Sequence, residues 1–431
     1  MNNFPTNLKS GHTISNSQPA GSTHTDSTGD REEVTVNLAN PAHGGSVIAR
    51  VDGQVVFVTG GLPGESDVRV VLDPASASKS KRSFRTGSAV SVGQPSPHRI
   101  EGQCPAAAAG AGCCDLDFVD SEGSIDFKRE VVTDQLRRIG RIELSDDRVD
   151  THVLQPTLGW RTRVRLGVNE NGRAGLRKKD SHEIVEISVA TCAQWAPGLV
   201  EGLSEHEFTP NAEVSVALGD DGTRSFVELT GSRNQPHREV VLGDPTIVHQ
   251  VGDVAWSLPA DAFWQGHHAA PEFYSSWIQK HVPAGEGVAW DLYGGAGVFA
   301  VALADRVDAV DSVDVGSEST DAGKAAMTLA NIDNVRFVSG DVARQLDALR
   351  SHEGLHAVVL DPPRTGAGKN VVRRIAQSRP QHVVHVGCDP ATAARDLAEW
   401  VANGYQIDAL TVVDAFPLTH HVEMLVALSR V

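Results

Sequence analysis

Residues 288–297 read Val-Ala-Trp-Asp-Leu-Tyr-Gly-Gly-Ala-Gly, a short apolar run that passes directly into a glycine-rich turn. A short apolar run next to a turn signal is typical of a buried strand. Glycine lets the backbone turn tightly and approach a ligand closely. A lone Gly-x-Gly is more often a plain turn, so the surrounding residues must decide whether this one binds anything.

The pattern of strand, loop and helix repeats from about residue 282 to the C-terminus. Further strands are predicted at 309–313, 335–338, 357–360 and 383–386, and helices at 371–377 and 390–402. This alternation predicts a mostly parallel sheet covered by helices on both faces. Because such sheets bind ligands at the carboxyl ends of their strands, the residues that follow each strand are candidate site residues.

Acidic residues lie at the strand ends beside the glycine turn. Asp291 precedes the turn, Asp314 closes the next strand and Asp341 follows the third. A carboxylate after the second strand can accept hydrogen bonds from ribose hydroxyls, and Asp341 could reach an adenine amine. The layout predicts a nucleoside cofactor. The turn led by an aspartate favours S-adenosylmethionine over a dinucleotide.

Three more candidates lie farther along the same sheet edge. Asp361 begins a rigid Asp-Pro-Pro-Arg loop after the fourth strand, where proline cannot continue a sheet. Cys388 follows the fifth strand and precedes Asp389 and Pro390, which are suited to cap and begin a helix. A helix N-terminus favours a thiolate, so Cys388 is a candidate nucleophile. Glu423 is either a surface carboxylate or a catalytic base.

The chain before this sheet divides into three parts. Residues 1–32 are rich in Ser, Thr, Asn and Gly, and we expect a disordered tail. Residues 33–98 contain several short strands, including a hairpin around Asp52-Gly53, which predicts a small β-barrel. Residues 99–260 mix a helix near 124–139 with short strands and turns, typical of an α+β domain.

The 431-residue chain has a net charge of −17, which excludes a uniformly basic nucleic-acid binder. Two basic segments stand out against this background. They contain the candidate RNA-binding residues Arg82, Arg85, Arg161, Arg163, Arg165, Arg177 and Lys178. Each segment is either a solvated surface or an edge that follows a phosphate backbone, and charge alone favours the solvated surface.

Five scattered cysteines argue against a disulfide scaffold and favour a reducing cytoplasm. We find no secretory signal at the N-terminus and no apolar run long enough for a membrane helix, so we expect a cytoplasmic protein without membrane contact.

Taken in order, these motifs resemble the RNA uridine-C5 methyltransferases. The 33–98 region, with Gly44-Gly45 and Leu62–Glu65, is similar to the RNA-binding TRAM barrel of that family. Residues 263–267 resemble its Phe-Phe-Gln segment, and 388–397 and 416–423 resemble its nucleophile and closing motifs. The resemblance implies a Rossmann-like class I methyltransferase domain at 261–431, after an OB-like barrel and a central α+β domain.

The resemblance also implies roles for the site residues. Cys388 would attack uracil C6, Glu423 would remove the C5 proton and Asp361 would contact the uracil edge. The cofactor would be S-adenosylmethionine. The residues implied to bind it are Gln265, Asp291, Tyr293, Gly295, Gly297, Asp314, Asp341 and Asp361. The target base would have to leave its stack to reach these groups.

Members of this family with a TRAM domain often bind a [4Fe–4S] cluster, which implies Cys104, Cys113, Cys114 and Cys192 as ligands. Their spacing departs from the usual pattern, and Ala111 stands where a second ligand is expected. The alternative is a set of packed or exposed thiols.

The barrel favours ribosomal RNA over transfer RNA as the substrate, and we expect a monomer. Two other functions stay open: methylation of another base or position, and RNA binding without turnover. Departures from the family's pattern support RNA binding without turnover. They are Gly387 and Asp389, where Ser and Asn are more usual, and Gly266-His267.

Overall fold

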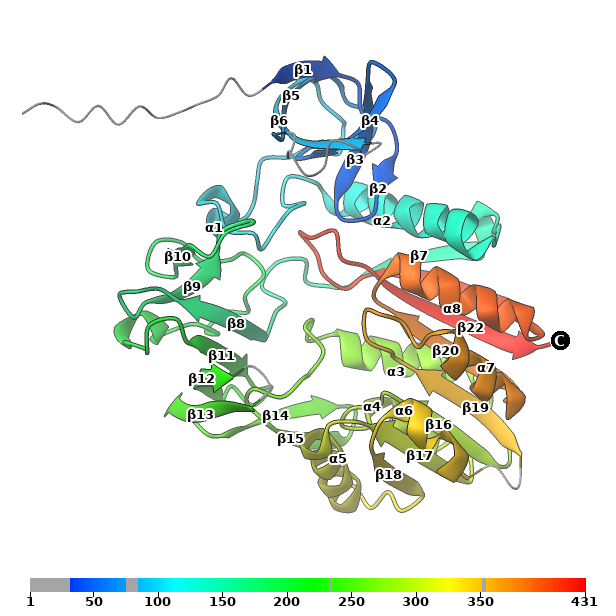
Figure 1. Ribbon diagram of the computed structural model, residues 1–431. Coiled ribbons are helices and arrows are strands. Elements are labelled where there is room, and N and C mark those ends of the chain that lie inside the picture. The colour runs from blue at the N-terminus through cyan, green and yellow to red at the C-terminus, as the bar shows by residue number, and fades with distance from the viewer. Residues whose placement is uncertain (1–31, 75–83, 233–234, 351–353) are drawn as a thin grey trace, which may run out of the picture.

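The computed structural model describes residues 32–74, 84–232, 235–350 and 354–431. The expected tail and Arg82 lie outside these residues, apart from Glu32 at the tail's end. The described chain forms three sheets of six or more strands and one two-stranded hairpin. Figure 1 shows the N-terminal sheet above, the middle sheet at the left and the C-terminal sheet at the right.

The N-terminal sheet curls around its own core. Its strands are β1 (Glu33–Val36), β2 (Pro41–Ala42), β3 (Ser46–Val51), β4 (Gln54–Thr59), β5 (Ser66–Leu72) and β6 (Phe84–Gln94), in the order β1-β5-β6-β4-β3-β2. Alternate side chains such as Val56, Val58, Val68 and Val70 are fully buried inside it. The predicted hairpin is confirmed as β3 and β4, which pair on either side of Asp52-Gly53.

The middle region contains an antiparallel sheet. Its strands are β8 (Arg163–Val168), β9 (Ala174–Arg177), β10 (Ile184–Glu186), β11 (Glu213–Leu218), β12 (Arg224–Ser232) and β13 (Gln235–Leu242). A short helix, α1 (Pro105–Ala108), precedes it and a hairpin of β14 (Thr246–Val251) and β15 (Val254–Pro259) follows it. Two 3-10 turns, Asp146–Arg148 and Leu203–Glu205, lie in the same region.

The C-terminal sheet has eight strands in the order β18-β17-β16-β19-β20-β22-β21-β7. Its first five are parallel, β22 is antiparallel to both neighbours, and β7 is parallel to β21. The strands are β7 (Val149–Val153), β16 (Val288–Leu292), β17 (Ala309–Asp314), β18 (Val335–Ser339), β19 (Leu355–Leu360), β20 (His382–Gly387), β21 (Tyr405–Asp414) and β22 (Glu423–Arg430).

Helices cover both faces of this sheet, as the alternation predicts. One core joins the sheet to α2 (Ser121–Gln135), the π-helical turn Leu136–Gly140, α6 (Val342–Gln345), the 3-10 turn Leu346–Ala348, α7 (Lys369–Gln377) and α8 (Pro390–Ala402). A second core on the other face contains side chains of α3 (Ala270–His281) and α4 (Val298–Ala304). The hairpin β14–β15 and α5 (Ser317–Leu329) form a smaller core at the sheet edge.

The predicted boundary between the central and C-terminal regions is wrong in one respect. Strand β7 and helix α2 fall within residues 99–260, yet β7 is the outer strand of the C-terminal sheet and α2 packs on that sheet. The chain therefore enters the C-terminal sheet, leaves it to build the middle sheet and returns. A short strand such as β7, with three exposed residues, has no apolar pattern that reveals its partner.

None of the described helices is long and apolar enough to span a membrane.

Candidate active site

The glycine turn after β16 is rigid and closely packed. Tyr293, Gly295 and Gly297 all adopt positive φ, at 62°, 55° and 78°. A Cβ at Gly294 would lie 2.2 Å from Oδ2 of Asp291, so only glycine fits there. A Cβ at Gly295 would meet nothing within 4 Å, so the turn has open space at this position, at the carboxyl edge of the sheet.

Asp291 is fully buried beneath the turn. Its Oδ2 accepts a hydrogen bond from the Ser312 hydroxyl at 2.9 Å, while Oδ1 has no hydrogen-bond partner among the described residues. Burial raises the pKa of Asp291 to about 7, with Asp314 and Asp361 adding to the shift. A buried, unpartnered carboxyl oxygen beside a glycine turn fits a ligand that brings a hydrogen-bond donor.

Two further carboxylates lie at the ends of the next strands, as predicted. Asp314 accepts hydrogen bonds from the backbone N–H groups of Gly295 at 3.1 Å and Gly316 at 2.7 Å. The glycine turn therefore fixes the position of this carboxylate. Asp341 follows β18 and caps α6 by accepting from the N–H of Arg344 at 3.2 Å.

Gln265 and Asp361 come together from positions 96 residues apart. The Gln265 amide Nε2 donates to Oδ2 of Asp361 at 3.3 Å. Burial raises the pKa of Asp361 to about 7, although the hydrogen bond from Gln265 opposes the shift. Near neutral pH this group is therefore both a carboxylate and a carboxylic acid, able to accept or to donate a hydrogen bond.

Cys388 and Glu423 lie at neighbouring ends of the adjacent strands β20 and β22. The antiparallel register pairs Gly387 with Met424, so the next position along places Cys388 opposite Glu423. Glu423 is buried, and its Oε2 has no hydrogen-bond partner in the described chain. Burial and then Asp361 raise the pKa of Glu423 well above its ordinary value, while Arg364 opposes them. A carboxylate in such a position is a strong base.

The surroundings of Cys388 oppose the effect of the helix N-terminus on its thiol. Asp389 and Pro390 do cap and begin α8 as predicted. Burial nevertheless raises the pKa of Cys388 to about 12, with Glu423 and Asp361 adding to the shift. Two carboxyl groups and the loss of water outweigh the helix dipole, whose effect is limited to about 1–2 kcal/mol.

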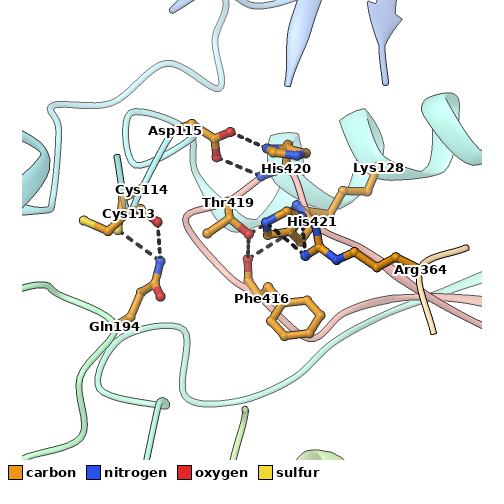
Figure 2. Close-up of polar contacts among 10 residues, drawn as sticks. All are labelled: Cys113, Cys114, Asp115, Lys128, Gln194, Arg364, Phe416, Thr419, His420 and His421. Atoms are coloured by element: carbon orange, nitrogen blue, oxygen red, sulfur yellow. Dashed lines mark hydrogen bonds and ion pairs between the residues drawn. The ribbon is translucent and has the colours of Figure 1, made fainter. Parts of the chain in front are cut away.

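The loop between β21 and β22, residues 415–422, is held from both sides (Figure 2). Both carboxylate oxygens of Asp115 accept from His420, one from its backbone N–H at 3.0 Å and one from its ring Nδ1. The His421 ring lies 3.4 Å from the Arg364 guanidinium of the Asp-Pro-Pro-Arg loop. These contacts fix the chain immediately before Glu423.

A buried ion pair supports the start of the same loop. Lys128 on α2 is fully buried, and its Nζ donates to Oδ1 of Asp414 at 2.5 Å and to the carbonyl of Phe416 at 3.3 Å. The Ser124 hydroxyl donates to the other oxygen of Asp414 at 2.8 Å. Sequence reasoning missed Lys128 because a lysine in an amphipathic helix normally belongs to its exposed side.

Tyr274 on α3 is a second residue that sequence reasoning missed. Its side chain is fully buried, and its hydroxyl has no hydrogen-bond partner among the described residues. Burial raises the pKa of this hydroxyl, and the negative charges of Glu423, Asp361 and Cys388 raise it further. The apolar pattern of α3 marks Tyr274 as a core residue, and nothing in it signals the neighbouring acids.

The basic candidates have separate environments. Arg85 pairs with Glu32 at 2.8 Å, Lys178 pairs with Glu183 at 2.6 Å, and Arg165 and Arg177 approach Glu213 at 3.5 and 3.3 Å. Arg165 and Arg177 are exposed and line a cavity of about 420 Å³ that also borders Cys113.

Arg161 and Arg163 point into the protein. The Arg161 guanidinium stacks on Trp160 and donates to Gln194 at 2.9 Å. Arg163 donates to the carbonyl of Ala260 at 3.0 Å and to that of Ala262. Arg163 thus holds the segment that leads to Gln265, and its role as an RNA contact stays a prediction.

The four cysteines predicted as ligands do come together. Cys104 caps α1, Cys113 and Cys114 follow it, and Cys192 comes from the loop after β10. Their Sγ atoms all lie within 4.8 Å of one another, and all but Cys113 are buried. The fifth cysteine, Cys388, is not part of this group and lies near Glu423 at the end of β20.

Comparison with known proteins gives consistent matches. The family described as tRNA (Uracil-5-)-methyltransferase matches residues 247–431. An uncharacterized RNA methyltransferase of Corynebacterium efficiens is 44% identical over 416 residues, covering 93% of this chain and 95% of the relative. The 23S rRNA (uracil(1939)-C(5))-methyltransferase of Methylococcus capsulatus is 30% identical over 444 residues, covering 93% and 97%.

Among solved structures, the tRNA (uracil-54, C5)-methyltransferase of Pyrococcus abyssi, in complex with S-adenosyl-L-homocysteine, matches with a TM-score of 0.67 at 20% identity. The match covers 91% of this chain and all of that one. The two chains share a fold.

Proposed function

Because this chain belongs to the S-adenosylmethionine-dependent RNA (uracil-5-)-methyltransferase family, we propose that it methylates C5 of a uridine in 23S ribosomal RNA through a covalent adduct of Cys388. The observation that carries this proposal is the register of β20 and β22, which places Cys388 and Glu423 at neighbouring strand ends. C5 methylation of uracil needs both a nucleophile and a base on the same ring.

The cofactor residues support the proposal. When bound, S-adenosylmethionine supplies an electrophilic methyl group. The glycine turn, the unpartnered oxygen of Asp291, the fixed carboxylate of Asp314 and the Gln265–Asp361 pair offer a polar edge suited to hold it. Tyr293, Gly295, Gly297 and Asp341 complete the proposed set, with Asp341 already used in part as a helix cap.

The chemistry begins with a thiol that must lose its proton. A thiol with a pKa of about 12 is almost wholly protonated at neutral pH, so we place its proton loss to solvent after the ligands arrive. The thiolate then adds to uracil C6 and the C5–C6 electrons move toward the carbonyl oxygen, which makes C5 nucleophilic. Asp361, half protonated near neutral pH, can donate to that developing oxyanion.

The second half of the reaction uses Glu423. Once C5 carries both its hydrogen and the methyl group, the Glu423 carboxylate takes the C5 proton. The C5=C6 bond re-forms and the bond between C6 and Sγ of Cys388 breaks, which returns the thiolate. The products are 5-methyluridine, demethylated cofactor and a proton. A single chain supplies both groups, so we propose a monomer.

The choice of ribosomal RNA rests on the relative from Methylococcus capsulatus, whose name gives a 23S rRNA target. We propose that the N-terminal sheet is the RNA-binding TRAM barrel and that the exposed Arg165, Arg177 and Lys178 with Arg85 bind phosphates. The target base must be flipped to reach buried Glu423.

The proposal is tested by methyl transfer from labelled cofactor to unmodified transcripts of 23S rRNA domains and of tRNA. We expect 5-methyluridine at one position in a 23S fragment and none in tRNA. Product in tRNA alone would reverse the choice of substrate. A methylated base other than 5-methyluridine would contradict the chemistry, and tight RNA binding without any methylation would leave an RNA-binding function.

A further inference from the structure

The four-cysteine group, Cys104, Cys113, Cys114 and Cys192, is small and compact. The Sγ of Cys104 lies 3.7 Å from that of Cys113 and 3.8 Å from that of Cys192, and the Sγ of Cys114 lies 3.6 Å from that of Cys192. All six separations fall within 4.8 Å. The distances between the sulfurs can therefore be compared with those around a [4Fe–4S] cluster and around a single metal ion.

A [4Fe–4S] cluster does not fit this arrangement. Each of its four thiolates binds a different iron at a corner of the cube, which spreads the sulfurs to roughly 6 Å apart. Every separation here is at least 1 Å shorter. A cube would require all three cysteine-bearing segments to move outward together, although Cys104, Cys114 and Cys192 are buried in one apolar core.

A single tetrahedral ion fits it well. Zinc binds thiolates at about 2.3 Å, and the edge of a tetrahedron with that radius is about 3.8 Å. Three of the six Sγ–Sγ distances are 3.6, 3.7 and 3.8 Å. We propose that Cys104, Cys113, Cys114 and Cys192 bind one zinc ion.

The surroundings of the sulfurs support this assignment. The Gln194 amide Nε2 donates to Sγ of Cys114 at 3.2 Å, and the backbone N–H of Ala107 donates to Sγ of Cys104 at 3.5 Å. Such second-layer donors offset the negative charge of metal-bound thiolates. The Arg161 side chain, which donates to Gln194, adds a positive charge nearby.

The site is structural, because four protein ligands leave a tetrahedral ion no open position for substrate. Figure 2 shows where its effect leads: Cys113 and Cys114 continue directly into Asp115, whose carboxylate holds His420. The ion would fix the segment that holds the 415–422 loop at His420, three residues before Glu423. This inference rests on sulfur geometry and stands whether or not the chain methylates ribosomal RNA.

The test is metal and sulfide analysis of the full chain, expressed with both iron and zinc supplied and purified with and without oxygen. We expect one zinc per chain, no acid-labile sulfide and no broad visible absorption. Cobalt substituted for zinc should give the intense visible bands of a tetrahedral thiolate site. Cys192→Ser should lose the metal, and the matched control Cys388→Ser, which changes the cysteine outside the group, should keep it.

Three results would overturn the assignment. Four irons with four sulfides per chain would show that the segments do open to take a cluster. One iron without sulfide would keep the tetrahedral geometry and replace zinc. Absence of any metal from both preparations would leave four packed thiols. Each result is read on the wild type, so the test does not depend on Cys192→Ser folding.

Discussion

The proposed cofactor edge and the 415–422 loop lie at the same end of one sheet, yet they are built differently. At this edge, Asp291, the glycine turn and Asp314 lie within 24 residues. Gly295 of the turn donates to Asp314, and Ser312 on the neighbouring strand donates to Asp291. The loop depends on Lys128 and Asp115, each about 300 residues away in sequence. The edge around the glycine turn can be predicted from neighbouring residues, whereas the 415–422 loop is positioned only after three distant segments have packed.

The two regions should differ in their sensitivity to substitutions elsewhere in the protein. A turn held by its own backbone and neighbouring strands survives changes elsewhere in the protein. A loop held by a buried ion pair and a carboxylate from another domain should be the sensitive part of the catalytic centre. The experiments below separate the two, from the largest expected effect to the smallest.

Replacing the nucleophile should abolish the reaction while sparing the cofactor edge. We expect Cys388→Ala to reduce methyl transfer by about 10⁴-fold or more, because addition to C6 has no substitute. Cofactor binding, measured by calorimetry, should change by less than about threefold. A variant that still forms 5-methyluridine at a tenth of the wild-type rate would remove Cys388 from the mechanism.

Breaking the buried ion pair should cost more stability than any surface pair. Lys128→Met leaves the Asp414 charge buried without its partner, which costs about 3–5 kcal/mol in the free energy of unfolding. Denaturant titration measures this loss. The matched control Lys324→Met breaks the exposed pair with Asp321 and should cost less than about 0.5 kcal/mol. Equal losses in the two variants would contradict the buried pair's importance.

Titration of Asp291 should make the free energy of unfolding fall as the pH rises. Its pKa is about 7 when folded, against about 3.9 when unfolded, so the folded state binds the extra proton between these values. Unfolding free energy should therefore decrease from pH 5 to pH 8 by about 2–3 kcal/mol on account of this group.

The check is to compare wild type with Asp291→Asn over that pH range. The variant lacks the titrating group, so its stability should fall less between pH 5 and pH 8, whatever the constant cost of the substitution. A parallel decline in both proteins would show that the Asp291 carboxyl is ionised throughout.

Releasing the hold on His420 should loosen the loop and leave the cofactor edge intact. We expect Asp115→Ala to raise amide hydrogen exchange at residues 416–421 by about tenfold, as losing a hydrogen bond of about 1–2 kcal/mol predicts. Exchange in residues 291–297 should stay unchanged. Removing the metal from the cysteines should raise exchange at residues 416–421 of the wild type by a similar amount. The same treatment should raise exchange in Asp115→Ala little further. Additive increases would show that the metal does not act on the loop through Asp115.

The exposed arginines should have the smallest effects. Arg165→Ala and Arg177→Ala should each weaken RNA binding a few-fold and lower the salt slope by about one, without changing the methylated position. Fluorescence anisotropy at several salt concentrations measures both quantities. Lys324→Ala, on α5, is a suitable control and should leave the slope unaltered. A shift in the methylated position would instead make either arginine a specificity residue.

The contrast between the two regions also explains what the sequence could predict. Strand 288–292 and helix 390–402 have the predicted bounds, because apolar runs, glycines and a capping aspartate are local signals. The same signals located Cys388 and Glu423 at neighbouring strand ends. They give no information on the burial and the two acids from other strands that raise the pKa of Cys388.

Other features that local signals do not reveal have the same cause. Arg163 alternates like a surface residue, but its partners are carbonyls almost a hundred residues away. Strand β7 carries no mark of joining β21, and Lys128 resembles any other lysine of a helix. The four cysteines were predicted as one ligand set and do come together, but their spacing in sequence does not give the distances between the sulfurs.

The central claim is that Cys388 and Glu423 act on the same uracil ring, and a trapped adduct tests it most directly. Glu423→Gln, incubated with cofactor and unmodified 23S rRNA fragments, cannot remove the C5 proton and should accumulate a protein–RNA complex that survives denaturation. After digestion, mass spectrometry should find methylated uridine attached to the peptide that contains Cys388. Free 5-methyluridine at the wild-type rate with no adduct, or an adduct on another residue, would contradict the claim.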